Sequence, residues 1–455
     1  MTTSDPGQLL DDFSALLAND PGALSTQSGY YVPNLHGTGA EDVVALLGRA
    51  IRRSHGDAQL YYFSGQRGTG KSTELRRLEI LLNGQPGTRA YIVDALDYIG
   101  DTHPIDTLDL LLVTAAAFAD RLSQPDALGH EPDGPERPLQ RFTRWLATEV
   151  EITGVTLGGV KAEFKQQQQS LMQRLRAFDL ARQERVMAEC RAHIGHLAAA
   201  VQQRWQASKV VLMVDSLERL RGIGKDATEM FDRVVRVFDG DLNQLHVPGL
   251  HMVYAVPPYL PYLTNIKALV QLFMLASVRV CEPPSRARRK PREAGLQAMR
   301  QVVERRCPRW RELLTEPALD RLILTSGGDL RQLLRRLLLD TLDEASFALD
   351  RLPLQADDAL LETVVQRHRV EFESLVVQDE YPLLKGIAEQ NALELRHRDE
   401  LPVVAHFFDV RAVLNYRNGV DWLDLNPLLW QLIDQSQRPP SPSMPPAPVA
   451  GSPAP

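Results

Sequence analysis

The chain has 455 residues, enough for two to four domains that each bury a core of their own. Its apolar and charged fractions, 44% and 24%, exclude wholesale disorder, and its net charge of -7 argues against a generally basic nucleic-acid coat. The three scattered cysteines, Cys190, Cys281 and Cys307, form neither a disulfide framework nor a metal-binding spacing, which indicates a reducing cytoplasm.

The N-terminal stretch "MTTSDPGQLLDDF" lacks a basic region followed by a long apolar core, so no secretory signal is predicted. The most apolar window, near "LDLLLVTAAAFAD", is about half the length needed to span a bilayer. We therefore expect a cytoplasmic protein without a membrane partner.

Residues 1–58 are predicted to be mainly helical. The segments "DPGQLLDDFSALLA" and "GAEDVVALLGRAIRRS" carry apolar residues at three-to-four spacing, and the Pro/Gly-punctuated loop "YYVPNLHG" separates them. Five short apolar runs then predict buried parallel strands with helices between them, at 59–65, 89–95, 209–216, 250–256 and 276–282.

More than a hundred residues lie between the second and third predicted strands. This insert contains the apolar "HPIDTLDLLLVTAAAFADRL", a predicted hairpin in "EVEITGVTLGGVKAEF" and a predicted long helix from about Gln167 to Gln206. Such an insert is not needed to close a sheet, so it indicates a specialised addition to the core.

From about residue 292 the strand pattern stops and a small helical bundle is predicted. Farther on, Asn418-Gly419 between two apolar runs predicts a hairpin turn, so helices followed by a hairpin indicate a winged-helix-like module. The tail, with eight prolines in eighteen residues, predicts disorder. The expected units are an N-terminal helical segment (1–58), a core (59–284) with an insert at about 100–208, a helical lid (285–352), a winged-helix-like domain (353–437) and the tail (438–455).

The stretch "GQRGTGKST" matches the pattern G-x-x-x-x-G-K-[ST] after a predicted strand and before a predicted helix. Glycines let backbone N–H groups approach phosphate oxygens, and the helix start presents further N–H groups to the anion. Lys71 is expected at the β- and γ-phosphates of ATP, Ser72 on Mg²⁺ and Thr73 at the α-phosphate. The predicted phosphate-binding residues are Gly65, Gln66, Arg67, Gly68, Thr69, Gly70, Lys71, Ser72 and Thr73.

The third predicted strand, in "VVLMVDSLERL", ends at Asp215, which is the form of a Walker B acid that organises Mg²⁺. Hydrolysis also needs a group that positions the attacking water. The next residue is Ser216, so Glu218 is the nearest candidate. It is equally suited to be the acid that helix starts favour, and both interpretations stay open.

The chain resembles AAA+ and STAND ATPases of the origin-recognition and signal-transduction branch. The resemblance rests on "GQRGTGKS", on "VDSLERL", on a helical region after the fifth predicted strand, and on "TSGGDLRQLLRRL", which is similar to a sensor 2 region. It implies that Arg331 contacts the γ-phosphate and that loop 30–37 packs around the base. The alternative for Arg331 is a surface arginine on an amphipathic helix, with Arg335 on the same face.

Three departures from that family weigh against a processive ring motor. Two prolines occupy the tip of the fourth strand, so Thr264 or Asn265 would have to reach back to the nucleotide. The segment before the fifth strand contains Lys267 but no arginine finger. The long insert before the Walker B strand is the third departure.

The favoured interpretation is an α/β P-loop NTPase sandwich with a helical lid and a winged-helix-like module. It would bind ATP and Mg²⁺ and act as a slow ATPase and nucleotide-gated switch with a protein partner or in self-assembly. The alternative is a DNA-bound ATPase of loader or transposition-regulator type that uses the basic cluster between Arg286 and Arg292. The acidic "NGVDWLDL" at the predicted wing favours the switch.

Overall fold

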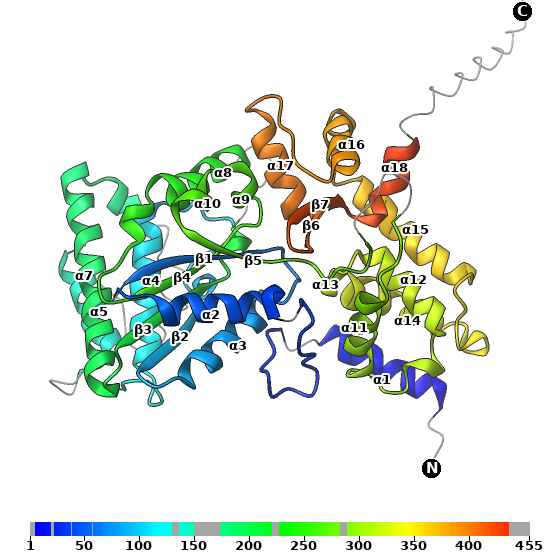
Figure 1. Cartoon of the computed structure of the whole chain (residues 1–455), viewed down its shortest axis with the longest axis horizontal. Coiled ribbons are helices and arrows are strands. Elements are labelled where there is room, and N and C mark those ends of the chain that lie inside the picture. Colours follow the sequence, from blue (N-terminus) through cyan, green and yellow to red (C-terminus); the bar gives the residue numbers. More distant parts are fainter. Residues whose placement is uncertain are drawn as a thin grey trace, which may run out of the picture.

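A five-stranded parallel sheet forms the centre of the first two thirds of the chain in this computed structural model (Figure 1). Its spatial order is β2-β3-β4-β1-β5. The strands are β1 (Gln59–Gly65), β2 (Thr88–Asp94), β3 (Lys209–Asp215), β4 (His251–Val256) and β5 (Gln271–Leu275). The structure describes residues 5–19, 22–37, 39–56, 58–129, 136–149, 173–220, 227–282 and 289–435.

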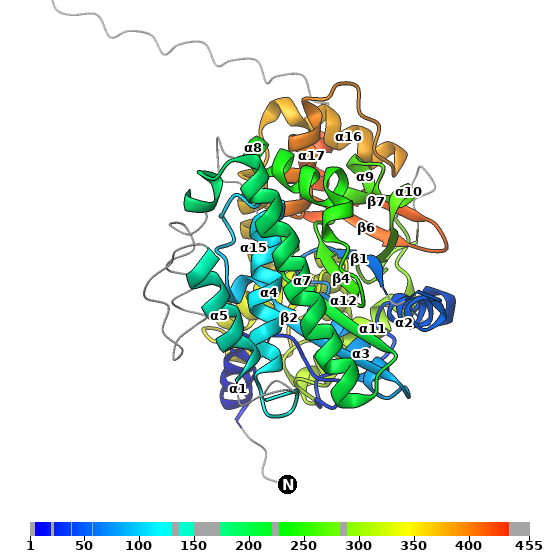
Figure 2. The same cartoon turned by 90° about the vertical axis from the view of Figure 1, so that its left-hand side faces the viewer.

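Helices cover both faces of this sheet, as the continuous apolar strands require. One layer is α2 (Val43–Arg53) and α3 (Lys71–Asn83), which share a core with Tyr61 and Phe63 of β1. The other layer contains α4 (Thr107–Leu122) and α7 (Leu180–Trp205), which lie in front of the strands in Figure 2. The fold class predicted for the core, a P-loop NTPase sandwich, is confirmed.

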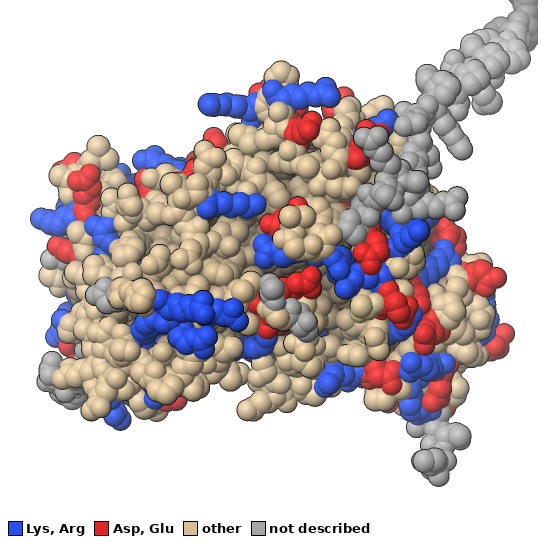
Figure 3. All heavy atoms as spheres, viewed as in Figure 1, with Lys and Arg blue, Asp and Glu red and all other residues tan. Residues whose placement is uncertain are grey.

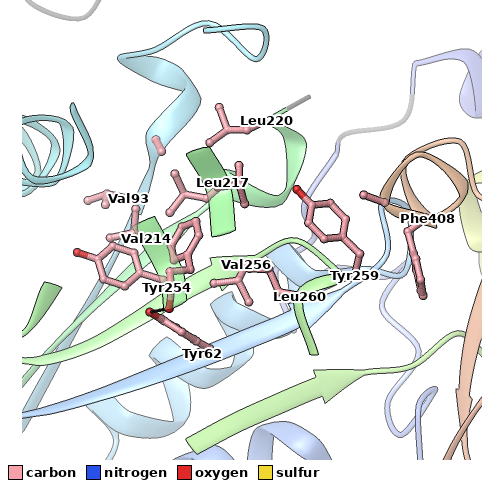
Figure 4. Packing of buried hydrophobic residues seen from close by; sticks show 14 of the residues in the cluster. Tyr62, Val93, Val214, Leu217, Leu220, Tyr254, Val256, Tyr259, Leu260 and Phe408 are labelled. Atoms are coloured by element: carbon pink, nitrogen blue, oxygen red, sulfur yellow. Dashed lines mark hydrogen bonds between the residues drawn. The ribbon is translucent and has the colours of Figure 1, made fainter. Parts of the chain in front are cut away.

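Tyr62 shows how the strand alternation divides the core. Its side chain points away from α2 and α3 and packs with Tyr254, Val214 and Val256 (Figure 4). Its hydroxyl donates to the carbonyl oxygen of Phe238 at 2.9 Å, so the buried polar atom is satisfied. The remaining helices of this region are α5 (Pro138–Glu149), α8 (Ala227–Val235), α9 (Leu260–Leu263) and α10 (Ile266–Leu269).

The first four strands lie within one residue of their predicted bounds, but the fifth was predicted wrongly at 276–282. The edge strand is instead Gln271–Leu275, which pairs with β1. Residues 276–282 leave the sheet: Ser277 N–H donates to Asn415 O at 3.0 Å, outside the sheet. The apolar residues Val278 and Val280 are buried there against the helical region, which explains their strand-like pattern.

The insert also differs from its prediction in one respect. The long helix α7 begins at Leu180, not near Gln167, because the side chain of Asp179 caps it by accepting the N–H of Arg182 at 2.8 Å. The hairpin predicted in 149–164 lies outside the described residues. None of the helices that the structure describes is both long and apolar enough to cross a bilayer.

The helical bundle predicted after residue 292 is present and lies beside the core. A π-helical stretch, Leu333–Leu338, joins its third and fourth helices, and the leucines at 333, 334, 337 and 338 are all buried. The bundle consists of α11 (Glu293–Glu304), α12 (Glu316–Ser326), α13 (Leu330–Gln332) and α14 (Leu339–Ala345).

A second group of helices ends in the predicted hairpin. Strands β6 (Val413–Arg417) and β7 (Asp421–Leu425) pair antiparallel around the Asn418-Gly419 turn. The accompanying helices are α15 (Ala359–Glu373), α16 (Tyr381–Gln390), α17 (Glu400–Asp409) and α18 (Trp430–Gln435). In Figure 1 α16, α17 and the hairpin lie at the top, whereas α15 lies at the right and packs against α14 of the bundle.

The N-terminal segment is divided between the two halves of the molecule. Helix α1 (Pro6–Ala18) packs against α14 of the bundle, whereas α2 packs on the sheet (Figure 1). The loop between these helices therefore crosses from the bundle to the core. This crossing places residues 22–37 at the end of the sheet where the P-loop lies.

We predict that Gly295→Ala destabilises the protein by about 1–3 kcal/mol. A Cβ atom at Gly295 would lie 2.0 Å from the carbonyl oxygen of Arg279, so the segment after β5 would have to move away from α11. Urea denaturation measures the change.

Gly386→Ala is the matched control, because a Cβ at this helical position meets nothing within 4 Å. This variant should gain about 0.5–1 kcal/mol from helix propensity. Equal midpoints for wild type and Gly295→Ala would contradict the close packing of α11 on residues 279–280.

Candidate nucleotide-binding site

The loop between β1 and α3 has the backbone that a phosphate requires. Gly68 and Gly70 have φ of 90° and 92°, in the left-handed region that glycine adopts without strain. Helix α3 begins at Lys71, so its first N–H groups face the loop. Residues 65–73 thus run from a strand end through a glycine turn into a helix start, as the Walker A pattern predicts.

Lys71 is held inside the site by two acceptors. Its Nζ donates to the carbonyl oxygen of Gln66 at 2.8 Å and lies 3.0 Å from Oε1 of Glu218. Both side chains of this ion pair are almost fully buried, at 3% and 5% exposed. Glu218 therefore lies against the predicted phosphate-binding lysine. Its other oxygen, Oε2, has no hydrogen-bond partner among the described residues.

Asp215 and Ser72 are brought together at the end of β3. Their side chains form a hydrogen bond, and the N–H of Ser216 donates to Asp215 Oδ1 at 2.8 Å. Burial, and then the nearby Glu218, raise the pKa of Asp215 to about 6. A buried carboxylate beside a hydroxyl is a donor set that suits Mg²⁺, so these residues fit the predicted metal site.

The helical bundle supplies one wall of the site. Arg331 lines the same cavity as the P-loop, and a Cβ at Gly68 would lie 2.8 Å from the Cβ of Arg331. Burial, followed by the charges of Arg411 and Arg335, lowers the pKa of Arg331. An anion placed in the cavity would relieve this repulsion between guanidinium groups. The predicted sensor arginine is thus in reach of the site, and Arg335 lines the cavity as well.

The predicted base-contacting loop forms another wall, with Tyr30, Tyr31 and Leu35 lining the cavity. His36 fixes the loop by donating from Nδ1 to Ala276 O at 3.0 Å, and burial lowers the pKa of its imidazole to about 4. The Leu24 N–H donates to the hydroxyl of Thr73 at 3.0 Å. That hydroxyl, predicted at the α-phosphate, therefore holds the N-terminal segment in this structure.

The complete cavity measures about 410 Å³ and is rich in cationic side chains. Several lining residues were given no role from the sequence: Glu74, one turn into α3, Arg219 beside Glu218, Val302 of α11, Arg306 just after α11, and Gly22, Ala23 and Leu24 of the N-terminal segment. Their positions depend on tertiary packing. Only the acid in the first turn of α3 carried a local signal, its place directly after "GKST".

Three residues between β4 and β5, of which Thr264 and Asn265 were candidates for a contact with the nucleotide, lie away from the site. Neither Thr264 nor Asn265 lines the cavity, and the Thr264 hydroxyl donates to Leu260 O at 2.9 Å instead. Lys267 lies 4.0 Å from Asp421 and 5.0 Å from the ring of Tyr262, outside the nucleotide cavity. The end of β4 thus offers the site none of these side chains.

The basic cluster is only partly described, because residues 283–288 lie outside the described ranges. Of its described residues, Arg289 pairs with Asp424 of β7 and lies over the ring of Trp430, and Arg292 lies 3.7 Å from Glu282. Arg289 therefore fastens the C-terminal hairpin and is committed to that contact. On the face seen in Figure 3, Lys and Arg gather instead over α2, whose Arg49, Arg52 and Arg53 are exposed.

No protein-family model and no curated protein matches the chain. Among solved structures it is similar to a Walker-type ATPase of Pyrococcus abyssi, with a TM-score of 0.37 and 12% identity over 87% of this chain and 95% of that chain. It is also similar to the ORC2 protein of Aeropyrum pernix, solved as ADPNP–ADP complexes, with a TM-score of 0.38 and 11% identity over 92% and 96%. The assignment to the P-loop NTPase fold rests on the strand order and the loop themselves.

We predict that Asp215→Asn raises the Tm of the nucleotide-free protein near neutral pH. The pKa of Asp215 is about 6 in the folded protein and ordinarily 3.8. At pH values above 6 the carboxylate is therefore ionised in a site that favours its protonated form, which lowers the free energy of unfolding. The variant should gain about 1–3 kcal/mol at about pH 7.5, and the gain should shrink as the pH falls through 6 toward 4. Thermal melts across this range test it.

Exposed Asp357 provides the control, since Asp357→Asn replaces a solvated carboxylate and should change the melting temperature little. If Asp215→Asn melts at or below the wild-type temperature near neutral pH, the carboxylate is not desolvated as described.

Proposed function

We propose that this protein is a Mg²⁺-dependent ATP-binding protein that hydrolyses ATP slowly and acts as a nucleotide-gated switch. The observation that carries the proposal is the buried Lys71–Glu218 pair, 3.0 Å apart, next to the Ser72–Asp215 hydrogen bond. Lys71, Ser72 and Glu218 line the cavity, and Asp215 lies beside Ser72, so a cation that would bind phosphate, two oxygens that would bind Mg²⁺ and a second carboxylate are adjacent.

The residues divide the chemistry among them. The loop N–H groups and Lys71 would hold the phosphates, and Ser72 and Asp215 would hold Mg²⁺, which neutralises phosphate charge when bound. Phosphate competes with Glu218 for Lys71, so nucleotide binding would release the carboxylate. Glu218 could then accept a proton from an attacking water. Arg331 would stabilise charge on the phosphate from the lid side.

A switch requires that the site be connected to another part of the molecule. Gln66 makes that connection: its backbone oxygen accepts Lys71 Nζ, while its buried side chain donates to Val413 O of β6. The hairpin also reaches the lid, because the Tyr416 hydroxyl donates to Gly327 O at 2.6 Å. Movement of Lys71 toward a phosphate would therefore shift Gln66 and, through it, the C-terminal hairpin.

The hydrolysis proposal is tested by steady-state phosphate release with Lys71→Ala and Glu218→Gln, alongside a measurement of bound nucleotide. Lys71→Ala should lose ATP affinity by at least about tenfold, because a charge-assisted contact is removed. Glu218→Gln should keep ATP binding and lose turnover by about 10²–10⁴-fold. Wild type that binds no Mg-ATP would overturn the proposal.

Stability must be followed in parallel, because removing one partner of a buried pair leaves the other charge unpaired. The double variant Lys71→Ala/Glu218→Gln removes both charges and should melt above Lys71→Ala. If Glu218→Gln hydrolyses ATP like wild type, another group positions the water.

The switch is tested by hydrogen exchange of residues 413–425 with and without Mg-ATP. Nucleotide should change exchange in the wild-type hairpin, and Gln66→Ala should reduce that change by removing the contact with Val413. Tyr416→Phe is the control, since it breaks a hairpin contact with the lid and leaves the P-loop link intact. An equal response in Gln66→Ala and wild type would refute this route of coupling.

A further inference from the structure

A carboxylate lies in the nucleotide cavity away from the predicted metal ligands. Glu74 is three residues after Lys71, which places it about 4.5 Å farther along the axis of α3. Its side chain is 9% exposed and lines the cavity together with Tyr30, Tyr31 and Leu24. Tyr31 contacts Glu74 and Leu24 contacts the adjacent Thr73, so an aromatic and an apolar residue lie near this carboxylate, as a site for a base requires.

The two oxygens of Glu74 have different partners. Oε2 accepts from Arg77 Nε at 2.7 Å, whereas among the described residues Oε1 receives only a long contact of 3.5 Å, from the hydroxyl of Tyr31. Arg77 is fixed in turn by Asp42, whose Oδ2 accepts its Nη1 at 2.9 Å. The carboxylate is therefore oriented by a rigid partner on one side and has spare acceptor capacity on the other.

The charge balance around this carboxylate supports an acceptor role. The guanidinium of Arg77 lies 2.7 Å from Oε2 of Glu74 and pairs with the carboxylate. Burial, followed by the charge of Glu74, raises the pKa of Tyr31 to about 12, so its hydroxyl keeps its proton. A carboxylate oxygen with one long hydrogen bond is a strong acceptor for a ligand N–H.

We propose that Glu74 determines base specificity by accepting a hydrogen bond from the 6-amino group of adenine at Oε1. Adenine presents an N–H donor at this position, whereas guanine presents a carbonyl oxygen that a carboxylate repels. This inference rests on the proposed ATP binding and names the part of the nucleotide that the site reads.

The test measures affinities for ATP and for purine riboside triphosphate, which differs from ATP by lacking the 6-amino group. Wild type should bind ATP at least about tenfold more tightly, the effect of one charge-assisted hydrogen bond. Glu74→Gln should reduce this ratio severalfold through weaker ATP binding. Both ligands meet the same altered protein, so a general structural perturbation cancels in the ratio.

Glu79→Gln is the matched control, because Glu79 lies on the same helix outside the cavity and should leave the ratio unchanged. Melting curves check that each variant folds. If Glu74→Gln does not fold, the ratio of affinities is measured with Glu74→Ala instead. GTP should bind more weakly than purine riboside triphosphate.

The two proposals fail in different ways. Equal wild-type affinity for ATP and purine riboside triphosphate, with both bound, overturns the role of Glu74 and leaves ATP binding intact. A second contrary result is that wild type binds ATP more tightly than 2′-deoxy-ATP, and that Glu74→Gln abolishes this difference without changing the ratio of affinities for ATP and purine riboside triphosphate. That result assigns Glu74 to the ribose and also overturns the inference. Absence of all nucleotide binding instead contradicts the proposed function.

Discussion

The buried ion pair between Lys71 and Glu218 is the constraint on which the site depends. Two charges removed from water are tolerated because each neutralises the other, and the loss of one partner costs about 3–5 kcal/mol in such pairs. The pair keeps the lysine inside the loop and keeps the carboxylate next to Asp215. A phosphate would compete with Glu218 for the lysine, so the contact that organises the site is also the one that a nucleotide would break. Stability of the free protein and affinity for the ligand are therefore opposed at this point.

The walls of the cavity come from segments that are distant in sequence, so the shape of the cavity depends on how these segments pack together. The core supplies the loop and the acids, the bundle supplies Arg331, and the N-terminal segment supplies the tyrosines. The C-terminal hairpin does not line the cavity, but it contacts the loop through Gln66 and the bundle through Gly327. A change in one wall must be accommodated by the others, because packed interiors deform little.

Local pattern predicted the core well and the long-range contacts poorly. Strands β1 to β4 are apolar runs bounded by turns, so their existence follows from periodicity. The segment 276–282 has the same pattern for another reason, since Val278 and Val280 are buried against the bundle. The role of Glu218 could not be decided from the sequence, because an acid that begins a helix and an acid that positions water can both stand three residues after Asp215. The link from Gln66 to Val413 joins residues 347 positions apart, and no local signal predicts a pair at that separation.

The crossing of the N-terminal segment has a consequence for how long a nucleotide stays. Helix α1 is packed on the bundle, α2 on the sheet, and residues 22–37 run between them along the cavity that both halves enclose. A ligand in that cavity would touch both halves and the segment that links them, so its binding would oppose their separation. The packing of α1 on α14 would then contribute to the residence time of a ligand, although neither helix lines the cavity.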